Sequence, residues 1–437
     1  MTTRQQAQTE WILSNFEGII GVGRAWGYAE GPVWYMFREH HILVRDQYLD
    51  EVRRLLRGAG YLRAEGEVAE PVEGETREEL PGEQVVQGVR LLRLTGQHTD
   101  TLGALEVIRD GTGSGADRLE GLGRGVATPD HLVSICNGHP GESGGCPATE
   151  PHPIAADSEL DPAPTSRRRA GEGVRVVVVD TGLDPEAERV RSWLAGVEGD
   201  PDLDIGKGSP RALAPYAGHG TFIAGIIRTL APGAEVVVRR GFDRAGAVFE
   251  STLVQTLDKV LDENYPDIIN MAAGTFTFDP TGLLSFEVFQ RNRLQHHKGV
   301  VLVVAAGNQG YRKPFWPAAA PWTVSVGALD RTLRARADFS NFGGWVDVYA
   351  PGEDLVNAFP TGLYTYVEPP YRDQDRQEHF TGRARWSGTS FATPVVSALI
   401  AARMSETGEN GRDAAAALLA LARTQHQPGV GAVLLPT

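Results

Sequence analysis

The chain has 437 residues, of which 41% are hydrophobic, so it is long enough for two domains that each bury a core. Its formal net charge of −14 argues against nucleic acid and anionic membrane surfaces as partners, because both attract basic patches. No apolar run reaches about 18 residues, so we expect no membrane-spanning segment.

The N-terminal segment predicts a cytoplasmic protein. Glu10 and Glu17 interrupt the stretch in which a secretory signal needs an unbroken apolar core. Cys136 and Cys146 are the only cysteines, which is too few for a disulfide framework and fits a reducing compartment.

Residues 1–136 predict a small domain in which strands and helices alternate. The acidic segment 65–83 predicts a loop. The order β-α-β-β-α-β is typical of an α+β sandwich of the ferredoxin-like kind. The expected elements are a strand at 42–44, a helix from Asp46 to Gly58, strands near Tyr61 and at 89–94, a helix at 99–108 and a strand at 131–135.

Residues 137–172 predict a linker, because they are rich in Gly, Pro, Ser and charge and lack a periodic apolar signal. After it, in residues 173–437, continuous β-branched runs alternate with amphipathic helices. Runs such as those at 174–180 and 299–307 are typical of strands buried on both faces. This half predicts a doubly wound α/β domain with a mostly parallel sheet, whose ligand site lies at the carboxyl ends of the strands.

Three polar residues lie where such a site is expected. Asp180 ends a strand, His219 begins an apolar helix, and Ser390 lies in a Gly-Thr-Ser turn before another helix. Each residue alone is well explained as a cap or a satisfied buried group. Together they supply a serine nucleophile, a histidine that takes its proton, and a carboxylate that holds the imidazole in one tautomer. The combination favours catalysis.

Asn308 adds a fourth group at the same edge, after the strand at 300–305. Acyl transfer places negative charge on the carbonyl oxygen of the substrate, and an amide directed at that oxygen stabilises it. The backbone N–H of Ser390 at its helix start is the second expected donor.

These residues lie in four segments, VVVVDTGLD, GHGTFIAG, AAGNQG and GTSFATPVVSA, and in this order they resemble the subtilisin family of serine endopeptidases. The resemblance extends from residue 174 to about residue 404. It implies that Asp180, His219 and Ser390 form a catalytic triad and that Asn308 belongs to an oxyanion hole. It also implies a peptide or protein substrate that pairs as a strand against residues 270–274.

The resemblance further implies the walls of the first specificity pocket. Neither wall carries a charge, which favours apolar or unselective residues at the cleavage position. The expected wall residues are Ala272, Ala273 and Gly274 on one side and Ala305, Ala306 and Gly307 on the other.

Two departures from the family pattern change the expectations. Only Pro232 and Gly233 stand where secreted relatives often insert a calcium-binding loop, so we expect neither a metal nor a cofactor. The segment 359–386, just before Ser390, is longer than in compact relatives and is either a lid, a specificity wall or a plain surface insertion.

The N-terminal domain has the element order of a subtilisin pro-domain. The resemblance therefore predicts that it docks on its own catalytic domain as a pro-domain-like or inhibitory unit. The alternative is an unrelated module that binds a substrate or a partner.

Other interpretations stay open at the level of sequence. His131, Cys136, His139 and Cys146 could form a zinc set, although their spacing is irregular and free thiols are favoured. The function itself has two rivals, a dedicated cytoplasmic peptidase that processes one partner peptide, and a non-catalytic regulator built on a protease fold.

Overall fold

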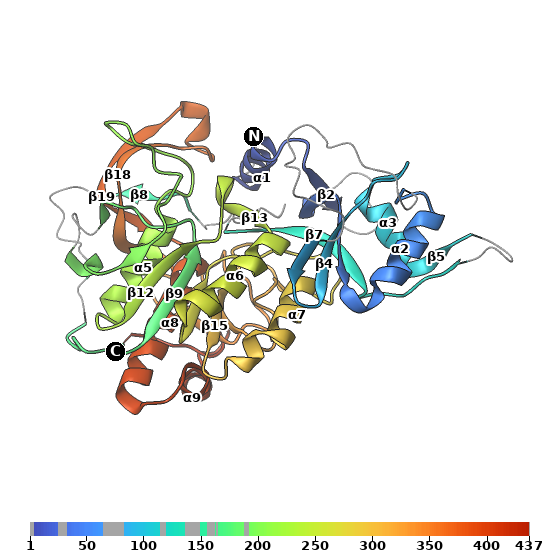
Figure 1. The fold of residues 1–437 in the computed structure, drawn as a ribbon. Helices are drawn as coiled ribbons and strands as arrows, with labels where there is room; N and C mark the ends of the chain where they lie inside the picture. Colours follow the sequence, from blue (N-terminus) through green and yellow to red (C-terminus); the bar gives the residue numbers. More distant parts are fainter. Residues whose placement is uncertain are drawn as a thin grey trace.

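The chain was analysed as a computed structural model, which describes residues 4–24, 33–63, 83–113, 119–135, 149–154, 162, 165–187 and 192–436. A seven-stranded sheet forms the centre of the second half (Figure 1). Its neighbouring strands are all parallel, and their runs of valine and alanine are buried. In spatial order the strands are β10 (Glu198–Gly199), β12 (Glu235–Arg240), β9 (Arg175–Asp180), β14 (Ile268–Met271), β15 (Val301–Ala305), β16 (Val324–Leu329) and β17 (Val348–Pro351).

Helices cover both faces of this sheet. They have to, because successive side chains of a strand point to opposite faces and both faces here are apolar. One face packs against α5 (His219–Leu230), α8 (Thr389–Thr407) and α9 (Gly411–Thr424). The other packs against α6 (Glu250–Asn264) and α7 (Leu284–Asn292). The predicted α/β fold of this half is confirmed. Within the described ranges, every helix is too short or too polar to cross a bilayer.

The N-terminal half has a second, antiparallel sheet with the path β13–β7–β2–β4–β3, and β1 (Ile20–Arg24) pairs with β2. Two helices, α2 (Leu49–Gly58) and α3 (Thr101–Asp110), cover one face. One member, β13 (Ala247–Phe249), belongs to the second half of the chain and pairs with β7. The other strands are β2 (Val33–Arg45), β3 (Glu83–Val86), β4 (Val89–Arg93) and β7 (Ala127–Ser134).

One local prediction for this half is wrong. Tyr61 lies in a bend after α2 rather than in a strand, and its ring is buried between the two helices. The strand is instead β3, which begins at Glu83, the last residue of the segment predicted as a loop; the other residues of that segment lie outside the described ranges. Val85 and Val86 hold it in place by packing with side chains of α6 and α7, a contact that the local sequence does not reveal. The first helix, α1 (Arg4–Asn15), was not expected either.

The open face of the N-terminal sheet packs on α6 and α7, and polar groups buried at this interface find partners. Asp130 accepts hydrogen bonds from the backbone N–H and hydroxyl of Ser251, at 2.9 and 2.7 Å. His131 Nδ1 lies 3.1 Å from Glu250 Oε2. These contacts join β7 to the first turn of α6.

The long segment before Ser390 is a hairpin of β18 (Leu355–Thr365) and β19 (Gln377–Trp386), which we call the arm. Its sheet includes β11 (Ala212–Leu213) and β8 (His152–Pro153). Figure 1 shows α1 between the arm and the N-terminal sheet, over β13. Side chains of α1 reach the arm, since Gln8 donates to Glu368 and Arg372 donates to Glu10.

Candidate active site

Asp180 is the last residue of β9, and its parallel neighbours β12 and β14 end at the same edge of the sheet. Its side chain is fully buried. One carboxylate oxygen, Oδ1, accepts the N–H of Thr181 at 2.8 Å and lies 2.7 Å from Nδ1 of His219. The other oxygen has no hydrogen-bond partner among the described residues. The carboxylate is thus fixed in position and directed at the imidazole.

His219 is the first residue of α5, and Gly218 before it has φ 79°. A side chain on Gly218 would come within 2.2 Å of Pro360 in the arm, so glycine is required at this close approach. Because a carboxylate only accepts, the Nδ1–H of His219 donates to Asp180. Nε2 then carries the lone pair, and it has no hydrogen-bond partner in the described part of the chain, Ser390 included.

Ser390 is the second residue of α8 and is 1% exposed. Its neighbours in the chain place it beside the histidine, because the rings of Trp386 and Phe391 lie 5.5 and 5.3 Å from the imidazole of His219. The helix start also leaves backbone N–H groups without intrahelical acceptors. Pro394 is tolerated in this first turn, where a missing N–H costs least.

Asn308 is held against the start of α8. Its side-chain oxygen accepts the N–H of Thr389 at 2.7 Å, and the Thr389 hydroxyl accepts the N–H of Gly307 at 3.1 Å. The oxygen of the amide is therefore used, and its NH₂ group remains as a donor next to Ser390. The structure thus brings Asp180, His219, Ser390 and Asn308 to one edge of the sheet.

The predicted pocket walls also lie at this edge, because β14 and β15 are parallel neighbours. Ala272, Ala273 and Gly274 follow β14, while Ala305, Ala306 and Gly307 end and follow β15; all of these residues are buried.

A segment of the N-terminal half pairs with the first of these walls. Ser134 and Gly274 exchange two backbone hydrogen bonds, at 3.2 and 3.1 Å. On its other side, the same segment pairs with β13, and the N–H of Ile135 donates to the carbonyl of Gly246 at 2.9 Å. Substrate pairing along residues 270–274 stays a prediction from the sequence. Nothing in the sequence indicated β13, because a three-residue strand carries no periodic signal.

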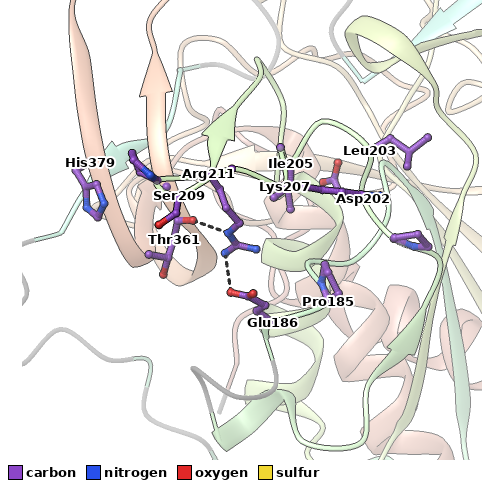
Figure 2. A pocket seen from close by; sticks show the side chains of 15 residues that line it. Pro185, Glu186, Asp202, Leu203, Ile205, Lys207, Ser209, Arg211, Thr361 and His379 are labelled. Atoms are coloured by element: carbon purple, nitrogen blue, oxygen red, sulfur yellow. Dashed lines mark hydrogen bonds and ion pairs between the residues drawn. The ribbon is translucent and has the colours of Figure 1, made fainter.

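A cavity of about 1170 Å³ lies between the loop that precedes His219 and the arm (Figure 2). In its wall, Arg211 donates to the carbonyl of Thr361 at 3.0 Å and lies 3.6 Å from Glu186. Asp202, also in the wall, accepts the N–H of Gly218, and burial raises its pKa to about 6. The wall therefore connects the arm to the start of α5, and the sequence did not single it out.

Within the described ranges, no group of three His, Cys, Asp or Glu residues is arranged to hold a metal ion. His131 is unsuited to the zinc set considered from the sequence, because both ring nitrogens are engaged. Nδ1 faces Glu250, and Nε2 accepts the N–H of Phe278 at 3.1 Å. The other candidates, Cys136, His139 and Cys146, lie outside the described residues.

Comparisons with known proteins match the second half. A sequence model of the Subtilase family matches residues 171–429. The chain is 30% identical over 259 residues to a thermophilic serine proteinase of Bacillus sp. (strain AK1), covering 55% of this chain and 54% of that protein. It is 28% identical over 264 residues to subtilisin NAT of Bacillus subtilis subsp. natto, covering 56% and 59%. The chain spans little more than half the length of these relatives.

Among solved structures, a cold adapted subtilisin-like serine proteinase is similar with a TM-score of 0.45 and 22% identity. The likeness covers 61% of this chain and 90% of that one.

Proposed function

The chain belongs to the Subtilase family, and on that premise we propose that it is a serine endopeptidase with Asp180, His219 and Ser390 as its catalytic triad. The observation that carries the proposal is the buried 2.7 Å contact between Asp180 and His219 Nδ1, which leaves Nε2 as a base beside the start of α8. The experiment that tests it is labelling of Ser390 by a fluorophosphonate.

In this mechanism the Ser390 hydroxyl attacks the carbonyl carbon of the peptide bond while His219 Nε2 takes the hydroxyl proton. Asp180 stabilises the imidazolium that forms. The NH₂ group of Asn308 and the N–H of Ser390 stabilise the oxyanion. His219 then gives its proton to the leaving amine, and water repeats the cycle on the acyl-enzyme.

Substituting Asn308 by aspartate should lower kcat by about 10² to 10³, with a much smaller change in KM. Aspartate keeps the oxygen that accepts the N–H of Thr389, so the helix start stays capped while the oxyanion donor is lost. The range is that of the corresponding substitution in another member of the same family. Steady-state kinetics with a chromogenic peptide measure the effect.

Asn308→Ala serves as the comparison for that result, since alanine removes the donor and the cap together. It should lose activity to a similar extent and also melt at a lower temperature. Unchanged kcat in Asn308→Asp would remove Asn308 from the oxyanion hole.

We further propose that residues 1–136 are a pro-domain-like, ferredoxin-like unit that inhibits the catalytic domain at 173–437, with 137–172 as the linker. Three features support this role. The segment ending at Ile135 lies between Gly274 and Gly246, where a substrate strand is expected. The helix α1 packs over this segment and contacts the arm. The sheet of this unit covers α6 and α7.

Docking of this unit should depend on pH through Asp130. Burial raises the pKa of this fully buried carboxyl from 3.8 to about 6. Its contribution to stability is therefore fully present below pH 3.8 and is lost as the pH rises through about 6. The free energy of unfolding should fall by roughly 3 kcal/mol, because the pKa of Asp130 lies about two pH units above its usual value.

The matched variant is Asp130→Asn, because asparagine can keep both hydrogen bonds to Ser251 without a titrating group. The free energy of unfolding of both chains, measured by urea denaturation from pH 4 to 7, checks the effect. We expect the unmodified chain to lose stability relative to Asp130→Asn over this range. Parallel pH profiles would refute the assignment to Asp130.

A further inference from the structure

The segment from Leu132 to Ile135 is an extended strand with partners on both sides, and we call the space that it fills between β13 and Gly274 the cleft. On one side Ser134, Val133 and Leu132 pair antiparallel with β13. On the other side Ser134 exchanges two hydrogen bonds with Gly274. A strand held by its backbone in this way presents alternate side chains to pockets, and these pockets decide which peptides bind. The chain's own segment thus reports what the cleft accepts.

Val133 and Ile135 are the two side chains that this segment buries in the apolar cluster shared by the N-terminal sheet and the second half of the chain. Val133 is fully buried and lies directly opposite Val248 of β13, so the two side chains share one face of the ladder. Ile135 is 2% exposed and belongs to the same cluster as Tyr216 and Phe242. Both positions are therefore apolar.

Gly246 leaves open the space that the side chain of Ile135 fills. A Cβ atom on Gly246 would lie 2.5 Å from Cγ1 of Ile135 and 3.3 Å from the ring of Tyr216. The absence of a side chain at residue 246 is thus what leaves room for a branched aliphatic group. Tyr216 lies three residues before His219, and its carbonyl accepts the N–H of His219 at 3.1 Å. Ile135 is therefore the position nearer to the reacting groups.

We propose that the cleft selects extended peptides with β-branched aliphatic residues at two alternate positions before the cut bond, and that Gly246 sets the side-chain size accepted at the nearer one. The inference rests on the proposed peptidase function and names its substrate class. Val133 and Ile135 mark the two positions, and Ser134 between them marks one that tolerates a small polar residue.

The test uses the full chain and synthetic peptides with the sequence of residues 128–139, varied at the positions of Val133 and Ile135. Mass spectrometry locates the cut bond, and initial rates give kcat/KM for each peptide. Valine or isoleucine at both positions should be preferred at least about tenfold over glycine or lysine at either. The chain's own segment competes equally with every peptide, so the ratios are unaffected.

Gly246→Ala isolates the residue that sets the size. It should lower, by about tenfold or more, the ratio of kcat/KM for peptides with isoleucine at the nearer position to kcat/KM for peptides with glycine there. The ratio is the quantity compared, because alanine at residue 246 also loosens the chain's own Ile135 and so changes the competition for all peptides alike. Gly408→Ala is the matched control. Gly408 has φ 74°, close to the 58° of Gly246, and a Cβ atom there would meet nothing within 4 Å. Gly408→Ala should strain the backbone to the same extent but leave the preference among peptides unchanged.

Fluorophosphonate labelling of Ser390 in the same samples distinguishes failure of the proposed specificity from failure of the proposed peptidase function. Labelled chain that cuts all peptides equally, or cuts none, would overturn the proposed specificity and leave the proposed peptidase function standing. Chain that is neither labelled nor active, even after an incubation long enough for the inhibitory unit to leave the cleft, would overturn the peptidase function first. An equal loss on all peptides in Gly246→Ala but not in Gly408→Ala would also contradict the role of Gly246.

Discussion

Replacing Ser390 by alanine is expected to abolish both peptide hydrolysis and labelling by a fluorophosphonate. In the proposed mechanism the hydroxyl is the nucleophile, and alanine leaves nothing for His219 to deprotonate. The fall in kcat should be about 10⁶, a size taken from another member of the same family. Activity assays and mass spectrometry of the labelled chain measure the result.

Ser397→Ala is a suitable control, because it removes a buried hydroxyl from the same helix, α8, that bonds to Asn270 instead. It should still be labelled. Intact mass of the unmodified chain and of Ser390→Ala, compared side by side, also reveals whether the chain cuts its own linker. Labelling that persists in Ser390→Ala would refute the proposed nucleophile, and absence of labelling in every form would favour a non-catalytic regulator.

Asp180→Asn should lower kcat by about 10⁴ while the fold is retained. Asparagine is nearly the same shape, but it has no negative charge to balance the imidazolium of His219, and the site is too buried for water to do so. Rates of the unmodified and substituted chains are compared with one peptide. Chains whose cleft is still occupied lower both rates by the same factor, so they do not affect the ratio of the two rates.

The control for this substitution is Asp200→Asn. Its carboxylate is partly exposed, and it accepts hydrogen bonds from the side chain of Arg239 and the backbone of Arg240, away from His219. It should change kcat only slightly. A loss below about tenfold in Asp180→Asn would argue against a charged partner for His219.

The sheet of the second half could be predicted because its signal is local. Runs such as 174–180 are apolar throughout, which is typical of strands covered on both faces, and β9 and β15 were found within two residues of their observed ends. The N-terminal half was harder. β3 consists of two exposed residues followed by Val85 and Val86, and these two side chains pack on helices that lie far along the chain. Similarly, α1 has few apolar residues and buries Ile12 against strands far along the chain.

The candidate site is likewise divided into residues that have a local sequence signal and residues that have none. The proposed site residues Asp180, His219, Ser390 and Asn308 could be singled out because each lies within three residues of the end of a regular element, where side chains converge on one edge of the sheet. Gly246 and Tyr216 could not. Their roles depend on a positive φ and on a strand contributed by the other half of the chain, and neither property has a local sequence signature.

The shared strand β13 has a kinetic consequence. It belongs to the catalytic half but forms the edge of the N-terminal sheet, so the cleft cannot empty until a sheet loses its edge strand. Cutting the linker would break one covalent bond and leave this pairing intact. Departure of the segment from the cleft should therefore be a first-order process. Activity should appear after a lag whose length does not depend on protein concentration, and the rate of departure would set an upper limit on activity.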